Sequence, residues 1–164
     1  MMKNLYIDFD GVIYNSIEVS YKIAEEEKIN KDYESYYQFF KNLDWCAVLE
    51  KSDEINDAFN CIRKIIDSSK FNVFILTHVV SLKEAELKVK LIREHLDDIT
   101  IIPVPKNLSK VKMVRVKDAI LVDDYPENLR EWREAGGLGV RFDLDMDGKG
   151  FPVISKLDEL IKMF

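Results

Sequence analysis

Two aspartates separated by one residue end a short apolar run near the start of the chain. Asp8 and Asp10 close the segment LYIDFD, and Gly11 follows them directly. If this run is a β-strand, side chains two positions apart point to the same face, so the two carboxylates lie together. Glycine allows the backbone to turn sharply at the next position. The spacing therefore predicts a pair of carboxylates presented at the end of a strand, with a plain polar turn as the alternative.

A second acidic pair, Asp123 and Asp124, follows the apolar run AILV. The carboxyl ends of neighbouring parallel strands meet at one edge of a sheet, where open α/β sheets bind their ligands. Two negative charges about 4 Å apart repel by about 4 kcal/mol at an effective dielectric constant of about 20, so such a cluster needs a cation or a shared proton. Carboxylate ligands without His or Cys favour Mg²⁺. We therefore predict a Mg²⁺ site that involves one or both aspartates of this pair.

Hydroxyl and amino groups also follow the predicted strands. Thr77, with His78 beside it, ends a second apolar run, and Lys106, Lys110 and Lys112 lie before the acidic pair. A metal, a hydroxyl and a lysine that converge on one point are suited to a phosphoryl group. We favour Lys110 because Leu-Ser-Lys opens a helix-like stretch, while the other two lysines remain alternatives. His78 is expected to form the pocket wall or a hydrogen bond rather than to act as a catalyst, and Thr77 could instead cap its strand.

The segments that must hold these groups alternate between strand-like and helix-like patterns. Five apolar runs are typical of strands covered on both faces, at residues 5–9, 71–76, 99–104, 119–122 and 138–142. Helical patterns follow at residues 81–96, 126–136 and 155–164. In the first of these, Ser81 and Glu84 form a capping-box pattern. We predict an α/β fold with a doubly wound, Rossmann-like, parallel sheet of five strands.

The connection between the first two predicted strands is too long for a single crossover helix. A whole βαβ unit takes about 30 residues, whereas residues 15–70 all lie between these strands. We predict a helical cap at residues 15–65, inserted into a core made of residues 1–14 and 66–164. Phe40 and Trp45, in an aromatic-rich part of this insertion, are candidates for stacking on a substrate, with packing inside the cap as the alternative.

Composition limits the classes of partner. The chain has 164 residues, of which 47% are hydrophobic, enough for one domain with a core. Its 24 basic and 30 acidic residues give a net charge of −6, and without a basic block we expect no nucleic-acid polymer as partner. The longest apolar run, FNVFIL, is too short to span a bilayer, and the opening MMKN does not resemble a secretory signal. We therefore expect a cytoplasmic protein without a membrane partner.

Two further patterns are read as structural. Cys46 and Cys61 have neither CxxC nor Cys/His spacing, so we expect buried free thiols. The segment DLDMDGKGFPVI, residues 143–154, begins like an EF-hand calcium loop, but Ile154 stands where that loop needs a glutamate, and Pro152 interrupts the exit helix. We predict an acidic surface turn there.

Taken in order, the motifs resemble those of a known superfamily. DFDGV at 8–12, ILT at 75–77, a lysine after the third strand and LVDD at 121–124 resemble the four ordered motifs of the haloacid dehalogenase-like (HAD) hydrolases. The insertion after the first motif is where that superfamily carries its helical caps. The short cap and the run LVDDYPENLREWREAGGLGVRF are similar to the 5′(3′)-deoxyribonucleotidase-like branch and its bacterial relatives.

The resemblance implies a two-step phosphoryl transfer. Asp8 would attack phosphorus and form an aspartyl phosphate. Asp10 would protonate the leaving alkoxide, later take a proton from the hydrolytic water, and help to hold the metal through its backbone carbonyl. Thr77, His78 and Lys110 would contact the phosphoryl group.

The metal and the substrate follow from the same resemblance. The ligands of the expected Mg²⁺ site would come from Asp8, Asp10, Asp123 and Asp124. The expected activity is that of a Mg²⁺-dependent phosphatase for a small phosphorylated metabolite, a phosphate monoester, with a (deoxy)nucleoside monophosphate as one candidate. A sugar-phosphate phosphatase, a phosphomutase and an inactive phosphate-binding protein remain alternatives.

Two other classes of protein fit less well. A phosphoacceptor signalling module would carry its acidic pair at the first strand, whereas this chain carries it at the fourth. A dehalogenase has no need for the acid at Asp10.

Overall fold

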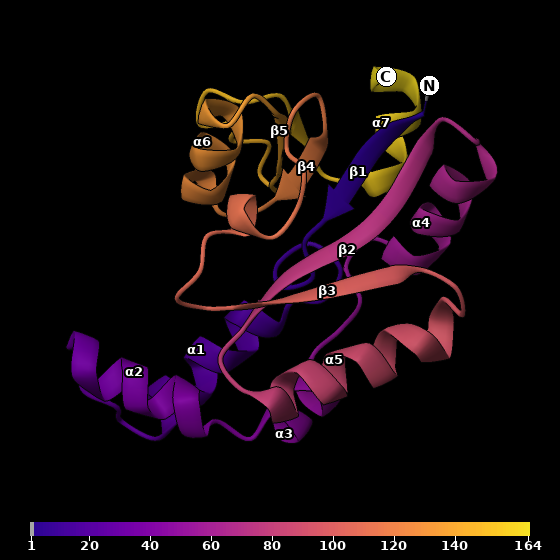
Figure 1. Cartoon of the computed structure of the whole chain (residues 1–164). Helices are drawn as coiled ribbons and strands as arrows, with labels where there is room; N and C mark the ends of the chain where they lie inside the picture. The colour runs from indigo at the N-terminus through magenta and orange to yellow at the C-terminus, as the bar shows by residue number, and fades with distance from the viewer. Residues whose placement is uncertain (1) are drawn as a thin grey trace.

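The computed structural model describes residues 2–164 and consists of a parallel β-sheet with helices on both faces (Figure 1). The sheet has six strands in the order β3-β2-β1-β4-β5-β6. They are β1 (Lys3–Ile7), β2 (Phe71–Val79), β3 (Thr100–Pro105), β4 (Ile120–Asp123), β5 (Leu138–Phe142) and β6 (Val153–Ile154). The helices are α1 (Ser16–Glu26), α2 (Tyr33–Asn42), α3 (Trp45–Lys51), α4 (Ala58–Asp67), α5 (Leu82–His95), α6 (Pro126–Glu134) and α7 (Leu160–Met163), with 3₁₀ turns η1 (Lys110–Lys112) and η2 (Leu157–Glu159).

The predicted α/β fold with a parallel sheet is confirmed, but the predicted number of five strands is wrong. The sixth strand, β6, pairs Val153 and Ile154 with the end of β5. Two residues are too few to form a recognisable strand pattern, and they follow an acidic turn and a proline, so no strand was expected there.

Apolar residues of the strands pack alternately on the two faces of the sheet. Leu5 and Ile7 of β1 belong to one core cluster, which α4, α5 and α7 cover. Tyr6, between them, belongs to the opposite cluster, where Trp132 of α6 is fully buried. The indole Nε1 of Trp132 donates to the carbonyl of Ala119 at 3.0 Å, so its polar atom is satisfied.

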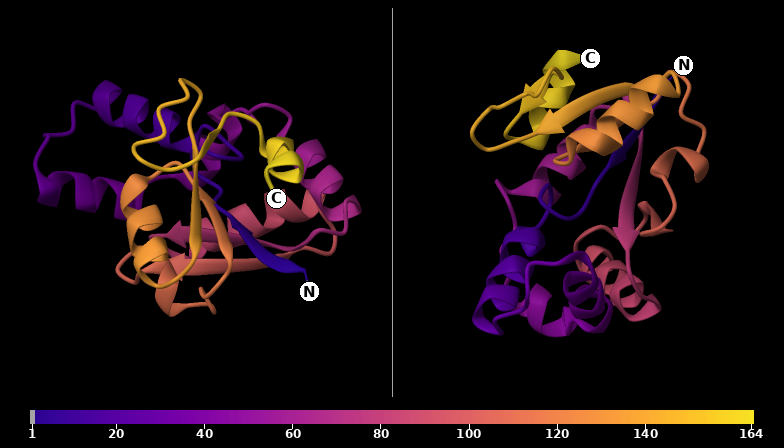
Figure 2. Two further views of the ribbon diagram at one scale, coloured as in Figure 1. Left: turned by 90° about the horizontal axis from the view of Figure 1, so that it is seen from above. Right: turned by 90° about the vertical axis from the view of Figure 1, so that its left-hand side faces the viewer.

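The inserted segment forms three helices at one end of the sheet. α1, α2 and α3 lie at the end opposite to both chain termini, as Figure 1 and the right-hand view of Figure 2 show. Val19 of α1 packs against Trp45 and Val48 of α3 in a small cluster of their own. α4 contributes Phe59 and Ile62 to the main core instead. The helices that stand away from the sheet are therefore α1 to α3, which we call the cap helices, while α4 packs on the sheet.

The start of α5 follows the predicted capping pattern in part. The Ser81 side chain accepts a hydrogen bond from the Glu84 amide at 3.1 Å, as an N-cap should. The Glu84 carboxylate, however, accepts from the amide of Val80 at 2.7 Å rather than returning to Ser81. This places the Glu84 carboxylate at the carboxyl end of β2.

Both cysteines are free, but only Cys61 is buried, and Cys46 is exposed on α3. The expectation of two buried thiols is therefore wrong for Cys46, whose side of α3 faces solvent.

In the acidic turn, the Asp143 carboxylate accepts from the amides of Asp145 and Asp147 and pairs with Arg141 at 2.9 Å. Within residues 2–164, no helix is long and apolar enough to cross a membrane.

Candidate active site

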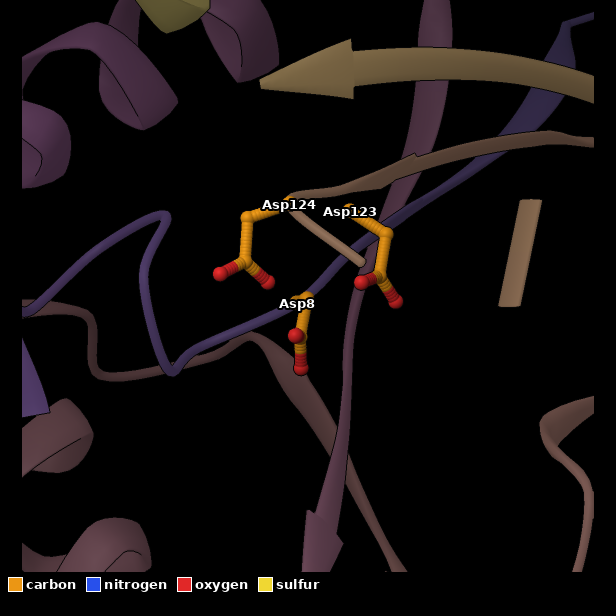
Figure 3. Close-up of side chains that lie close together, drawn as sticks. All are labelled: Asp8, Asp123 and Asp124. Carbon is orange, nitrogen blue, oxygen red and sulfur yellow. The ribbon is translucent and has the colours of Figure 1, made fainter. Parts of the chain in front are cut away.

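Three carboxylates meet where β1 and β4 end. Oxygen atoms of Asp8, Asp123 and Asp124, one from each side chain, lie within 4.8 Å of one another (Figure 3). The two strands are neighbours in register, and the Asp8 amide extends their pairing by donating to the carbonyl of Val122 at 3.0 Å. The carboxyl ends of β1 and β4 therefore lie side by side, as predicted.

Gly11 makes room for this cluster. Its φ angle is +76°, a conformation that residues with a side chain rarely adopt. A Cβ atom at this position would also collide with the Asp124 carboxylate. The turn after β1 therefore needs glycine both for its backbone angle and for the approach of Asp124.

Lys110 is the lysine that enters the carboxylate cluster. Its ammonium lies 2.9 Å from Asp8 and 2.7 Å from Asp123, and its side chain is only 2% exposed. Of the two alternatives, Lys106 lines a cavity beside the cluster and Lys112 is exposed. The 3₁₀ turn η1 brings Lys110 beneath the strand ends, as the helix-like stretch in the sequence suggested.

The two aspartates of the second acidic pair have different surroundings. Asp123 is fully buried and accepts from Lys110, from the amide of Tyr125 and from Nδ2 of Asn128, each within 2.9 Å. Asp124 lines a cavity, and within residues 2–164 no side-chain hydrogen bond or ion pair reaches it. Asp123 therefore holds Lys110 and the start of α6, whereas Asp124 has oxygen atoms free for a ligand.

Burial and mutual repulsion disfavour negative charge in the cluster. Desolvation, with a smaller contribution from neighbouring carboxylates, raises the pKa of Asp8 to about 7, although Lys110 opposes the shift. Desolvation, followed by the charge of Asp8 and Asp123, raises the pKa of Asp124 to about 8. Burial disfavours the charged form of Lys110, but the two aspartates beside it outweigh this effect and raise its pKa. A cation beside Asp8 and Asp124 would therefore favour the ionised forms of both carboxylates.

Asp10 does not join the other three carboxylates. Its Oδ2 atom accepts from Lys88 at 2.5 Å, and its Oδ1 atom accepts from the hydroxyl of Ser16 at 2.6 Å. The Asp8 amide still pairs with β4, whereas Asp10 lies in the turn that follows β1. Alternation along a strand therefore does not govern the side chain of Asp10. They line the same cavity, yet they are held by different lysines.

Lys88 is a site residue that the sequence did not single out. The apolar side chains of Ala85 and Val89 are only partly buried, whereas the buried residues of α5 are Glu84, Lys88 and Ile92. Their spacing of four was the available signal. A Glu and a Lys four residues apart on a helix are ordinarily interpreted as a solvent-facing ion pair, so this pattern predicted exposed side chains.

Thr77 and His78 both lie at the end of β2, with different access. Thr77 is fully buried, its Oγ1 atom lies 3.5 Å from Nζ of Lys88, and it lines neither cavity of the site. His78 lines both cavities, and its Nε2 atom lies 2.8 Å from the carbonyl of Leu108. Burial lowers the pKa of His78. A neutral ring that donates from Nε2 to this carbonyl fits the predicted hydrogen-bonding role.

Two cavities meet at Asp10. The first, of about 550 Å³, is lined by Asp8, Asp10, Asp124 and His78 among others. The second, of about 600 Å³, shares Asp10 and His78 and extends toward the cap helices. Its aromatic lining consists of Tyr21, Tyr33, Tyr36, Tyr37, Phe40 and Trp45.

The two predicted substrate-facing aromatics, Phe40 and Trp45, are both in this lining. They also pack within the cap. Trp45 belongs to the cap cluster with Val19 and Val48, and the Phe40 ring lies 5.5 Å from that of Tyr21. The two interpretations of these residues are therefore compatible, because each ring supports the cap and borders the cavity.

Comparison with protein-family models and with curated protein sequences gives no match. Comparison with solved structures gives matches to HAD-superfamily hydrolases over nearly the whole chain. A HAD phosphatase from Thermococcus onnurineus aligns with a TM-score of 0.67 and 21% identity, covering 99% of this chain and 97% of that one. A HAD-like hydrolase from Xanthomonas campestris aligns with a TM-score of 0.70 and 10% identity, covering 99% and 94%.

A third structure carries a metal. A HAD-type hydrolase from Bacillus subtilis, bound to magnesium, aligns with a TM-score of 0.63 and 14% identity, covering 99% of this chain and 98% of that one. At these identities the likeness concerns the fold. This chain therefore has the Rossmann-like fold of HAD-superfamily hydrolases.

The ion pairs of Lys110 lead to a test of stability. Lys110→Met would leave two buried carboxylates without their shared cation. Removing one partner of a buried ion pair costs about 3–5 kcal/mol, so we expect the free energy of unfolding in urea and EDTA to fall by about that amount. Lys112→Met, at an exposed position two residues away, should change it by less than about 0.5 kcal/mol. Equal stability of the two variants would contradict this arrangement.

Proposed function

We propose that the protein is a Mg²⁺-dependent phosphatase that hydrolyses a small phosphate monoester. The observation that carries this proposal is the cluster of Asp8, Asp123 and Asp124 with Lys110, at the carboxyl edge of the sheet beside an open cavity. A carboxylate nucleophile, a lysine and a place for a hard cation are the groups that phosphoryl transfer needs.

The donor set of the cluster fits Mg²⁺. All candidate ligands are carboxylate oxygens, which this ion prefers, and Asp124 has no competing partner among residues 2–164. Burial, followed by the charge of neighbouring groups, raises the pKa of Asp8 and of Asp124, and a bound cation would favour their ionised forms. When bound, Mg²⁺ would neutralise charge on the phosphoryl oxygens and orient them. We propose Asp8 and Asp124 as direct ligands, with Asp123 acting mainly through Lys110.

The proposed reaction has two displacements at phosphorus. In the first, an oxygen of Asp8 forms a bond to phosphorus while the bond to the ester oxygen breaks, and Asp10 gives its proton to that leaving oxygen. In the second, water attacks the aspartyl phosphate, Asp10 takes a proton from the water, and the bond between Asp8 and phosphorus breaks. Asp10 is protonated again at the end, so the cycle closes.

The remaining predicted contacts are assigned within this proposal. Lys110 neutralises charge beside Asp8, and His78 borders the phosphate cavity. Thr77 is fully buried next to Lys88, so its proposed contact with a phosphoryl oxygen requires the phosphate to reach the floor of the site.

The aromatic cavity supports a finer proposal about the substrate. Stacking of a planar group on aromatic rings contributes about 1–3 kcal/mol per base in proteins that bind single strands. The cavity begins at Asp10 and ends among the rings of α2, so an ester with its phosphate at Asp8 would extend along these rings. We propose a nucleoside monophosphate, consistent with the similarity of the sequence motifs to the deoxyribonucleotidase-like branch.

The nucleophile is tested by Asp8→Asn, which keeps the shape of the side chain but removes its charge. We expect turnover of an aryl phosphate, and of a panel of nucleoside monophosphates and sugar phosphates, to fall to background with Mg²⁺ present. The unmutated protein should lose its activity in EDTA and regain it with excess Mg²⁺. Asp145→Asn, the same change in an exposed turn, serves as the control. Full activity of Asp8→Asn would refute the proposed nucleophile.

The metal ligand is tested by binding rather than by turnover. Mg²⁺ that binds only the folded state adds about 2.7 kcal/mol of stability at 100 times its dissociation constant, so the melting temperature of the unmutated protein should rise with Mg²⁺. Asp124→Asn should lose this rise, because its amide is a weaker ligand. Asp145→Asn should keep it. An undiminished rise in Asp124→Asn would exclude a direct ligand role.

The substrate class is tested by Phe40→Ala. Losing one stacking partner should raise the KM for a nucleoside monophosphate by about fivefold to 100-fold, from about 1–3 kcal/mol of stacking, and leave the KM for a sugar phosphate nearly unchanged. Phe39→Ala is the control, because this neighbouring ring lines neither cavity. Equal effects of Phe40→Ala on both substrates would remove the nucleotide proposal without affecting the phosphatase proposal.

A further inference from the structure

A second buried lysine lies on the other side of the site from Lys110. Lys88 projects from α5, its side chain is only 1% exposed, and it lines neither cavity. It therefore lies behind residues that line the cavities, and Asp10, which it contacts directly, lines both of them. Lys88 can influence a substrate only through such neighbours, which also include Glu84 and Trp45.

The orientation of the Lys88 ammonium is fully specified. An ammonium has three donors, and its three nearest acceptors are Asp10 at 2.5 Å, Glu84 at 2.6 Å and the carbonyl of His78 at 3.1 Å, with the Thr77 hydroxyl farther away at 3.5 Å. Glu84 is fixed in turn, because its other oxygen accepts from the amide of Val80. The three shortest contacts are enough to use all donors of the ammonium.

Lys88 also connects the cap to the core. Its ammonium lies 4.8 Å from the centre of the Trp45 ring in α3 and 5.4 Å from that of Phe9 in the turn after β1. Both separations are within the range of cation–π attraction. The packing of α3 against α5 and the position of Asp10 therefore both depend on the Lys88 side chain.

Stability alone does not account for a charged group here. Replacing a buried ion pair with apolar residues of similar volume is often neutral or stabilising, because two ions lose their hydration when they are buried. A cap helix could be anchored on α5 by apolar contacts. What an apolar residue could not do is hold one oxygen of Asp10 at 2.5 Å while Ser16 holds the other at 2.6 Å.

We propose that Lys88, aligned by Glu84, is a positioning residue that fixes the carboxylate of Asp10 for proton transfer and ties it to the cap through Trp45. This inference rests on the proposed phosphatase function and deepens it. A misplacement of about 1 Å can cost about 10²-fold in rate. We therefore expect the contact between Lys88 and Asp10 to affect the reaction rate, although Lys88 touches no substrate.

The test uses Lys88→Met and two substrates that differ in their need for an acid. The alkoxide released from an alkyl phosphate is a poor leaving group and needs the proton from Asp10. The p-nitrophenolate released from p-nitrophenyl phosphate is stabilised and can leave without it. We expect kcat/KM, which reports the first displacement, to fall by about 10²-fold for the alkyl phosphate and much less for the aryl phosphate, whose leaving group does not need the proton. Lys90→Met, at an exposed position of α5, should affect neither. Equal losses for both substrates, or no loss, would overturn the proposal.

A second variant covers the case in which Lys88→Met does not fold because it leaves Asp10 and Glu84 unpaired. Glu84→Gln/Lys88→Met removes the second buried charge, keeps an acceptor for the amide of Val80, and leaves Asp10 with Ser16 alone. The same selective loss for the alkyl phosphate is expected, and a loss equal for both substrates would again overturn the proposal.

A crystal structure of whichever variant folds gives a result that does not depend on turnover. We expect the Asp10 carboxylate to leave its present orientation, and an unchanged carboxylate would overturn the positioning role. If the unmutated protein hydrolyses no phosphate ester, the phosphatase proposal fails, while the position of Asp10 in the variant still decides the role of Lys88.

Discussion

The organising constraint of this molecule is the burial of several like charges at one edge of its sheet. Four aspartates and Glu84 lie within or beside the site, and two almost completely buried cations, Lys88 and Lys110, pair with all of these carboxylates except Asp124. Burial raises the pKa of Asp8 and of Asp124, and these two carboxylates are the proposed ligands of a divalent cation.

Different elements of the fold supply the charged groups of the site. The parallel pairing of β1 with β4 brings the acidic segments together, and η1 supplies Lys110 from below the strand ends. α5 supplies Lys88 from the side of the cap. The site is thus divided between two lysines, one beside the proposed nucleophile and one beside the proposed acid. The two carboxylates that the sequence places two residues apart acquire separate environments in this way.

The sequence predicted those features that depend on local pattern. Apolar runs ending in acidic residues indicated the parallel sheet and the meeting of Asp8 with the second acidic pair. The helix-like stretch opened by Leu-Ser-Lys favoured Lys110 over the two neighbouring lysines. Prediction from the sequence failed where a tertiary contact overrides a local rule. β6 is too short to show a pattern, and strand alternation no longer applies to Asp10 in the turn after β1. Lys88 resembles a solvated helix residue until the carboxylate that receives it is known.

α5 carries both a core residue and the lysine behind Asp10 on a single face. Ile92, one turn after Lys88, is fully buried against the sheet, and Glu84 lies one turn before it. A change that shifts this helix to improve packing also moves the group that holds Asp10. Stability and rate are therefore coupled along α5, so selection for a more heat-resistant variant would find its safest substitutions on the other helices.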